Sequence, residues 1–145
     1  MASADEAIAE IEGRRAARKA ELDEQRKVQL ALDLEQLDEL ELKHGDNLVV
    51  RINVDRYVPD LPTMAVFRLP NPAETKRYKA QIQPRKNGQP GDAIAAAETL
   101  GQAALLYPEP DVFTRMCETF TTLLTNAAVT AIKASEGRAE EEGKG

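Results

Sequence analysis

The hydrophobic positions of this chain are grouped most densely between residues 92 and 133. Apolar residues recur three and four apart over residues 94–105, and the same spacing returns over residues 113–128. The segment between them, residues 107–111, contains two prolines. Because proline lacks an amide hydrogen and clashes with the preceding turn, it interrupts a helix. The pattern therefore predicts a helical hairpin with a proline-stiffened corner.

The longest uninterrupted helical signal covers residues 4–43. This segment is rich in Ala, Glu, Leu, Arg, Lys and Gln, contains no proline, and has Gly13 as its only glycine. Ser3 or Asp5 suits the helix start, and Gly45 suits its end. The segment is predicted to form one long, highly charged helix.

The last part of this helix, residues 30–42, alternates leucines with acids and carries leucine on more than one face. One interpretation is a solvated helix packed through a single leucine stripe. The other is an interaction arm, since helix-in-groove recognition uses anchors three and four residues apart. The alternation over residues 37–42 also fits a short strand, although composition favours helix. The partner-binding residues predicted for the arm are Leu30, Leu34, Leu37 and Leu40.

β-branched residues dominate residues 48–54 and 63–69, and each segment is predicted to be a strand. The loop between them is stiffened by Pro59 and Pro62, so the two strands should form an antiparallel pair. An isolated pair of strands is only marginally stable in water. This pair is therefore expected to lie on the helices or to join the sheet of a partner.

Asn71 followed by Pro72 predicts the start of a short helix over residues 73–83. The fold class predicted is α+β, mainly α, with a small antiparallel β element packed on about three core helices and a long charged N-terminal helix. The chain then divides into the long helix as interaction arm, a compact α+β core domain and a disordered polar tail, at residues 1–46, 47–137 and 138–145.

The net charge of −6 is unevenly distributed. Residues 1–46 hold 13 acids and 7 bases, whereas residues 47–137 hold 9 and 10. An acidic chain is a poor general ligand for nucleic acid. A single cysteine forms no internal disulfide, which suits a reducing cytoplasm. No apolar run of about 18 residues predicts a membrane span, and the N-terminus lacks the apolar region of a secretory signal.

The sequence predicts neither an enzyme nor a metal or cofactor site. His44 stands at the expected end of the long helix, where a cation is favourable, and one His with one Cys cannot assemble the usual metal sets. Cys117 falls on the apolar face of its helix and is interpreted as a small buried hydrophobe. No glycine-rich phosphate loop and no GxSxG motif is present.

One basic cluster, interleaved with Tyr78, stands out in the core domain. It is interpreted first as the solvated face of a short helix and its loop. Contact with phosphate or a base is a second interpretation, and an acidic partner, including the N-terminal segment of another copy in a homo-oligomer, is a third. The cluster comprises Lys76, Arg77, Lys79, Arg85 and Lys86.

Two short motifs resemble those of a known family. VFRLP at residues 66–70, followed by Glu74 and Tyr78, resembles the pattern of a strand, aromatic-Arg-x-Pro and a helix with Glu and an aromatic residue in small tailed-phage proteins. LLYP at residues 105–108 resembles their apolar-apolar-Tyr-Pro corner. The family is that of phage tail assembly chaperones and related virion-associated proteins, and the resemblance covers roughly residues 49–132. It implies a non-enzymatic protein that binds a tail component, such as the tape measure or tube protein, during assembly.

The function predicted is therefore a protein-binding assembly factor in the host cytoplasm, holding a tail or tape-measure client through apolar anchors. The alternative is a structural virion or compartment component retained in the finished particle, and a third hypothesis is an accessory to nucleic acid. No membrane partner is expected. The residues predicted to bind the partner in the core domain are Tyr78, Tyr107 and Phe113.

Overall fold

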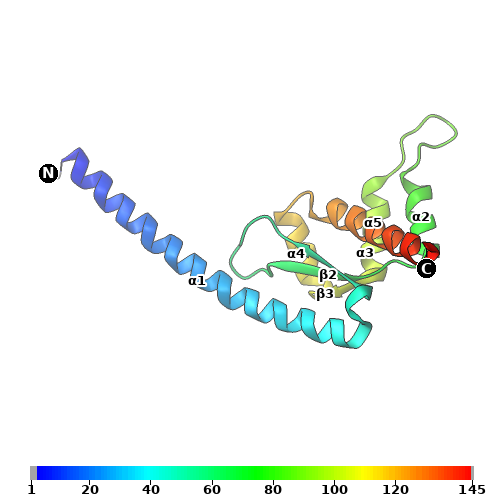
Figure 1. Cartoon of the computed structure of the whole chain (residues 1–145). Helices are drawn as coiled ribbons and strands as arrows, with labels where there is room; N and C mark the ends of the chain where they lie inside the picture. Colours follow the sequence, from blue (N-terminus) through cyan, green and yellow to red (C-terminus); the bar gives the residue numbers. More distant parts are fainter. Residues whose placement is uncertain (1–2, 145) are drawn as a thin grey trace.

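The computed structural model describes the backbone of residues 3–144 and the side chains of residues 3–137. The chain has the predicted α+β, mainly α architecture with a long N-terminal helix (Figure 1). The described elements are, in order, α1 (Ala4–His44), the 3-10 turn η1 (Asp46–Leu48), β1 (Val49–Asn53), β2 (Met64–Arg68), α2 (Pro72–Ile82), α3 (Ala93–Ala104), β3 (Leu105–Tyr107), α4 (Pro110–Thr119) and α5 (Leu123–Lys144).

A small antiparallel sheet in the order β1-β2-β3 separates helix α1 from a layer formed by α3, α4 and α5. Successive side chains of a strand point to opposite faces, and β2 shows this clearly. Met64 and Val66 are buried on one face against Leu37 of α1. Ala65 and Phe67 are buried on the other face, in a core to which α3, α4 and α5 contribute. The two faces of the sheet are thus covered by different parts of the chain.

The third strand corrects the prediction for the corner after α3. Leu105 was placed in the helical pattern, but its backbone is extended, with φ −64° and ψ 125°. Leu105 pairs with Phe67 of β2, and Tyr107 pairs with Val66. Two physical causes favour this: an unpaired edge of β2 needs hydrogen-bond partners, and a residue before proline, as Tyr107 is, prefers extended backbone.

The second half of the predicted hairpin is two helices, not one. The helix expected over residues 113–128 ends at Thr119, and Phe120 leaves it with φ −109° and ψ 92°. Three of residues 119–122 are threonines, whose branched side chains are less favourable in a helix. The break lets α4 and α5 bury Met116 and Leu123 in the same core on one face of the sheet.

The helix ends follow the predicted signals. The Ser3 hydroxyl accepts a hydrogen bond from a first-turn amide of α1, and Gly45 ends that helix with a φ of 98°, which glycine adopts without strain. Asn71 and Glu74 form a reciprocal capping box at the start of α2. The Asp92 side chain caps α3.

The segment predicted as a polar tail, residues 138–145, lies outside the described side chains. Its backbone belongs to α5 as far as Lys144, and Gly145 lies outside the described residues. The part of α5 with described side chains packs on the core through Ile132, and Ser135 donates a hydrogen bond to the Pro70 carbonyl at 2.9 Å.

Candidate functional site

A buried carboxylate joins α1 to the sheet. Asp33 is fully buried, and its two oxygens accept four hydrogen bonds. Oδ2 accepts from the Thr63 amide at 2.7 Å and from the Thr63 hydroxyl at 2.6 Å. Oδ1 accepts from the Tyr107 hydroxyl at 2.5 Å and from the Gln29 side-chain amide at 2.9 Å. We call this group of four residues the latch.

The latch is a structural joint. A buried charge is tolerated when its hydrogen-bonding capacity is satisfied, and Asp33 has no acceptor site left for a substrate. Burial, followed by the hydrogen bond to Asp33, raises the pKa of Tyr107 above its ordinary range, so its hydroxyl stays a donor. The sequence contains the signal for this joint: Asp33 stands three residues after Leu30 and four before Leu37, on the core stripe of the helix.

Beyond the latch, α1 leaves the body of the molecule. Every residue from Ser3 to Val28 is exposed, and Figure 1 shows this part of the helix running away from the sheet. We call residues 3–28 the projecting segment. It exposes Ile8 and Ile11 at 53% and 44%. At 1.5 Å per residue, the segment extends roughly 38 Å.

The six leucines in the last part of α1, residues 30–42, divide into two sets. Leu37 is buried in the α1 layer, and Leu30 and Leu40 pack against the same cluster. These three residues, predicted to bind a partner, instead attach the helix to its own core. Leu34 remains accessible at 40%, as do the other two leucines, Leu32 and Leu42.

The accessible residues form a surface opposite the attached side of α1. Val28, Leu32 and Leu42 are exposed at 58%, 53% and 79%, and Glu35 and Glu39 occupy the positions between them. Residues 28, 32, 35, 39 and 42 alternate four and three apart, so they share one helix face. We call these five residues the outer face. A row of large apolar side chains with acids between them is suited to a helical partner that carries bases.

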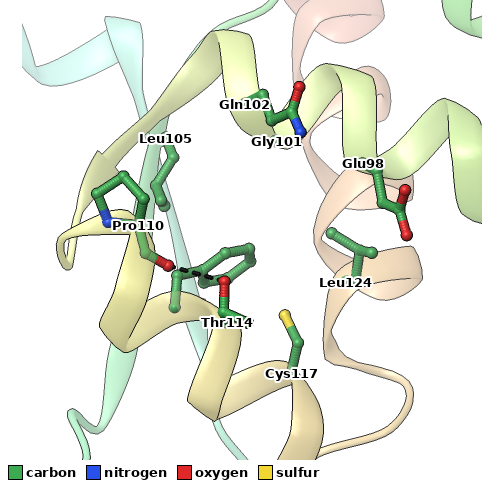
Figure 2. A pocket seen from close by; sticks show the side chains of 9 residues that line it. Glu98, Gly101, Gln102, Leu105, Pro110, Thr114, Cys117 and Leu124 are labelled. Atoms are coloured by element: carbon green, nitrogen blue, oxygen red, sulfur yellow. Dashed lines mark hydrogen bonds between the residues drawn. The ribbon is translucent and has the colours of Figure 1, made fainter.

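A groove lies on the other side of the sheet, between α3, α4 and α5. Its volume is about 400 Å³. Figure 2 shows the Cys117 thiol of α4 directed into it, with Leu124 of α5 opposite. Glu98, Gln102 and Thr114 supply its polar lining. The apolar lining comprises Gly101, Leu105, Pro110, Phe113, Cys117 and Leu124.

The groove is mostly apolar, and the thiol in its lining is not activated. Burial raises the pKa of the Cys117 thiol to about 11, so it stays protonated at neutral pH and is a weak nucleophile. Of the three core residues predicted to bind a partner, Phe113 lines the groove. Tyr78 is buried between α2, α3 and α5, and Tyr107 belongs to the latch, so the structure does not bring the three together.

The residues that carry the family resemblance hold the core together. Arg68, at the end of β2, forms a bidentate pair with Glu74 at 2.7 and 2.8 Å and also donates to the Ala103 carbonyl. The hydrogen bond from Arg68 lowers the pKa of Glu74. This arrangement connects β2, the start of α2 and the end of α3, so these side chains are occupied inside the chain.

The basic cluster lies on the exposed side of α2 and on the loop after it. Lys79 forms an ion pair with Glu136 of α5. The other cations are exposed, and their helix buries Tyr78 on its opposite side. This is the arrangement expected for the solvated face of a short helix.

Across residues 3–137 no three acidic, His or Cys side chains are grouped to hold a metal ion. Among the described helices, none combines the length and apolar content needed to cross a bilayer.

Comparisons with protein-family models, with curated proteins and with solved structures found no match to this chain.

Proposed function

We propose that this protein is a non-enzymatic, protein-binding assembly factor, similar in role to a phage tail assembly chaperone. It holds a tail or tape-measure client on the outer face of α1. The proposal places it in the host cytoplasm during assembly. The observation that carries it is the exposure of Val28, Leu32 and Leu42 on one face of a helix whose opposite face is fixed to the core.

Three exposed aliphatic side chains in one row are costly to leave in water and are typical of a recognition surface. The row is about 21 Å long, or four turns of helix. Glu35 and Glu39 within the row favour a client helix with bases at the matching positions. Because the latch holds α1 in place, the outer face is preorganised and binding does not have to order it.

A binding role also agrees with the chemistry of the polar groups. The oxygens of Asp33 already accept hydrogen bonds from donors of the chain. Burial keeps the Cys117 thiol protonated. Arg68 and Glu74 are hydrogen-bonded to each other. None of these groups is free to transfer a proton or to attack a substrate.

The second candidate is a structural component that stays in the finished particle. The latch favours it, because a rigid joint at Asp33 suits a permanent spacer as well as a carrier. The two candidates differ in one measurable property: a chaperone leaves the assembly, and a structural component remains at fixed stoichiometry.

The test is affinity isolation of the tagged full chain from its native producing cells, with co-eluting proteins quantified. The double variant Leu32→Asp with Leu42→Asp should reduce client recovery by about tenfold or more. Both positions are exposed, so folding should change little. The matched control is Ile8→Asp with Ile11→Asp, which adds the same charges to exposed apolar positions elsewhere on α1.

Full client recovery with the outer-face variant would refute the proposed binding surface. A client that elutes with the wild-type chain and is accompanied by it in purified particles would favour the structural component. Recovery of nucleic acid alone would overturn both candidates.

A further inference from the structure

The groove and the projecting segment of one chain lie on opposite sides of its sheet. The latch and Leu37 fix α1 to the face that carries Met64 and Val66. The groove is lined by α3, α4 and α5, which cover the face that carries Phe67. Figure 1 shows the projecting segment leading away from these helices. A chain cannot place this segment in its own groove.

The projecting segment has a stripe that continues the attached face of α1 beyond the core. Counting back from Leu37 at 100° per residue, the apolar residues Ile8, Ile11 and Leu22 fall within about 80° of that face. Arg15, Lys19 and Arg26 lie on the same side of the helix, within about 40° of Leu37. Three acids, Asp5, Glu12 and Asp23, lie within about 40° of Leu37 on the other side and border the stripe along that edge. We call the apolar and basic residues the inner stripe: Ile8, Ile11, Arg15, Lys19, Leu22 and Arg26.

All six residues of the inner stripe are exposed. The ion pairs found among the described side chains are Arg68–Glu74 and Lys79–Glu136, so the bases of the stripe have no close acidic partner there. The stripe therefore presents aliphatic side chains and positive charge together on one helix face.

The groove presents the complementary surface. Its walls are mostly apolar, and Glu98 is the charged residue in its lining. On α4, Asp111 and Glu118 are exposed and stand three and four residues from Thr114 of the lining, so they flank that wall. Arg115 is the single base on α4. An apolar groove with acidic edges fits a helix that carries isoleucines and bases on one face.

We propose that the groove binds the inner stripe of a second copy of this chain. Ile8 and Ile11 enter the apolar groove, and bases of the stripe lie near Glu98 and the acids of α4. The contact uses neither Leu32 nor Leu42, so it stands or falls independently of the client-binding function.

Direct pairing of two projecting segments is the less favourable arrangement. In an antiparallel pair centred on the inner stripe at residue 17, Arg15 of one copy lies opposite Lys19 of the other, and like charges repel. Docking into the groove replaces this repulsion by attraction. If two copies each bind the other's projecting segment, they form a closed dimer. If each copy binds the segment of a different neighbour, they form an open-ended oligomer.

Cross-linking of the purified full chain tests the contact directly. In Ile11→Cys, oxidation should join the new thiol to native Cys117 of another copy, because Cys117 points into the groove. A disulfide requires Cα atoms within about 7 Å. Glu10→Cys is the matched control. Residue 10 lies about 100° around the helix from residue 11 and more than about 100° from the centre of the inner stripe, so its side chain faces away from the proposed contact. Cross-linking should be at least about tenfold weaker in the control.

Two results would overturn the proposal. Equal cross-linking of Ile11→Cys and Glu10→Cys would mean random collision. Persistent cross-linking of Ile11→Cys after Cys117→Ser would mean that the projecting segments pair with each other. Peptide mapping of the cross-linked product identifies the two thiols in each case.

Sedimentation equilibrium provides the measurement that needs no cysteine. The wild-type chain should exceed its monomer mass of 15.9 kDa as concentration rises. Ile8→Asp with Ile11→Asp, and separately Glu98→Lys, should weaken association by about tenfold or more. Leu32→Asp with Leu42→Asp should leave it unchanged. A wild-type chain that stays monomeric at every soluble concentration would refute the contact while leaving the client-binding proposal intact.

Discussion

Removal of the Asp33 carboxylate tests whether the latch holds α1 on the sheet. In Asp33→Ala, the Thr63 amide, the Thr63 hydroxyl, the Tyr107 hydroxyl and the Gln29 amide all lose their acceptor. Thr63 is 9% exposed, so its amide cannot turn to solvent. Gln29 is partly exposed and its side chain can turn to water.

The expected loss of stability follows from these contacts. A hydrogen bond to a charged group contributes about 1.5–3 kcal/mol, and a buried donor left unsatisfied costs about 1–3 kcal/mol. The two Thr63 bonds give an upper value near 6 kcal/mol, and the carboxylate's own desolvation, now relieved, offsets part of it. We expect Asp33→Ala to lower the free energy of unfolding by about 3 kcal/mol. Asp33→Asn should lose about 1–2 kcal/mol, because its oxygen still accepts from Thr63 and its amide can donate to the Tyr107 hydroxyl.

The assay is urea unfolding followed by circular dichroism, with hydrogen exchange of the amides of residues 29–44. Asp33→Ala should unfold at lower urea and exchange these amides faster than the core strands. Glu35→Ala, an exposed acid two residues away, is the control and should change stability by less than about 0.5 kcal/mol. An Asp33→Ala variant as stable as this control would refute the reasoning.

Four further outcomes follow from the structure. The pKa of Tyr107 is higher in the folded than in the unfolded chain. Tyr107 therefore contributes its full stabilisation below the unfolded pKa and loses it as pH rises through the folded pKa. Tyr107→Phe should make the free energy of unfolding depend less on pH in alkaline solution. The pKa of Glu74 is lower in the folded than in the unfolded chain. Its stabilisation is therefore present above the unfolded pKa and is lost as pH falls through the folded pKa. Glu74→Gln should make the free energy of unfolding depend less on pH in acid. Gly101→Ala should raise thermal stability by about 0.5–1 kcal/mol, since its Cβ makes ordinary contacts. Gly91→Ala should lower it by at least about 2 kcal/mol, because its Cβ would lie 2.3 Å from a backbone oxygen.

Local signals in the sequence were sufficient for most of the fold. The long helix, both predicted strands and the start of α2 follow from composition, β-branched runs and the Asn71–Pro72 pair. These features depend on neighbours within four residues, and the physical rules for them act at that range. The break near Phe120 was missed because a run of threonines weakens a helix only slightly, and the packing of α4 and α5 then decides.

Features that depend on distant residues could not be read from local pattern. The third strand requires the free edge of β2, which lies about 40 residues earlier in the chain. The latch joins Asp33 to Thr63 and Tyr107 across separations of 30 and 74 residues. The end of α1 carries leucine on more than one face, so the sequence pattern does not show which leucines are buried. The packing of α1 on the sheet determines that Leu37 is buried and Leu42 is exposed.

The residues behind the family resemblance now have assigned structural roles, and these change what the resemblance supports. Arg68 and Glu74 connect β2 to α2 and α3, and Tyr107 belongs to the latch. Side chains closed inside the fold preserve a scaffold and do not select a client. The motifs of the resemblance are therefore occupied within this fold, and under the proposed function the client is selected by surfaces outside them. The outer face of α1 is such a surface, since the resemblance covers roughly residues 49–132 and leaves α1 out. Under the proposed function, replacing Leu32 and Leu42 should therefore change client binding without changing the fold.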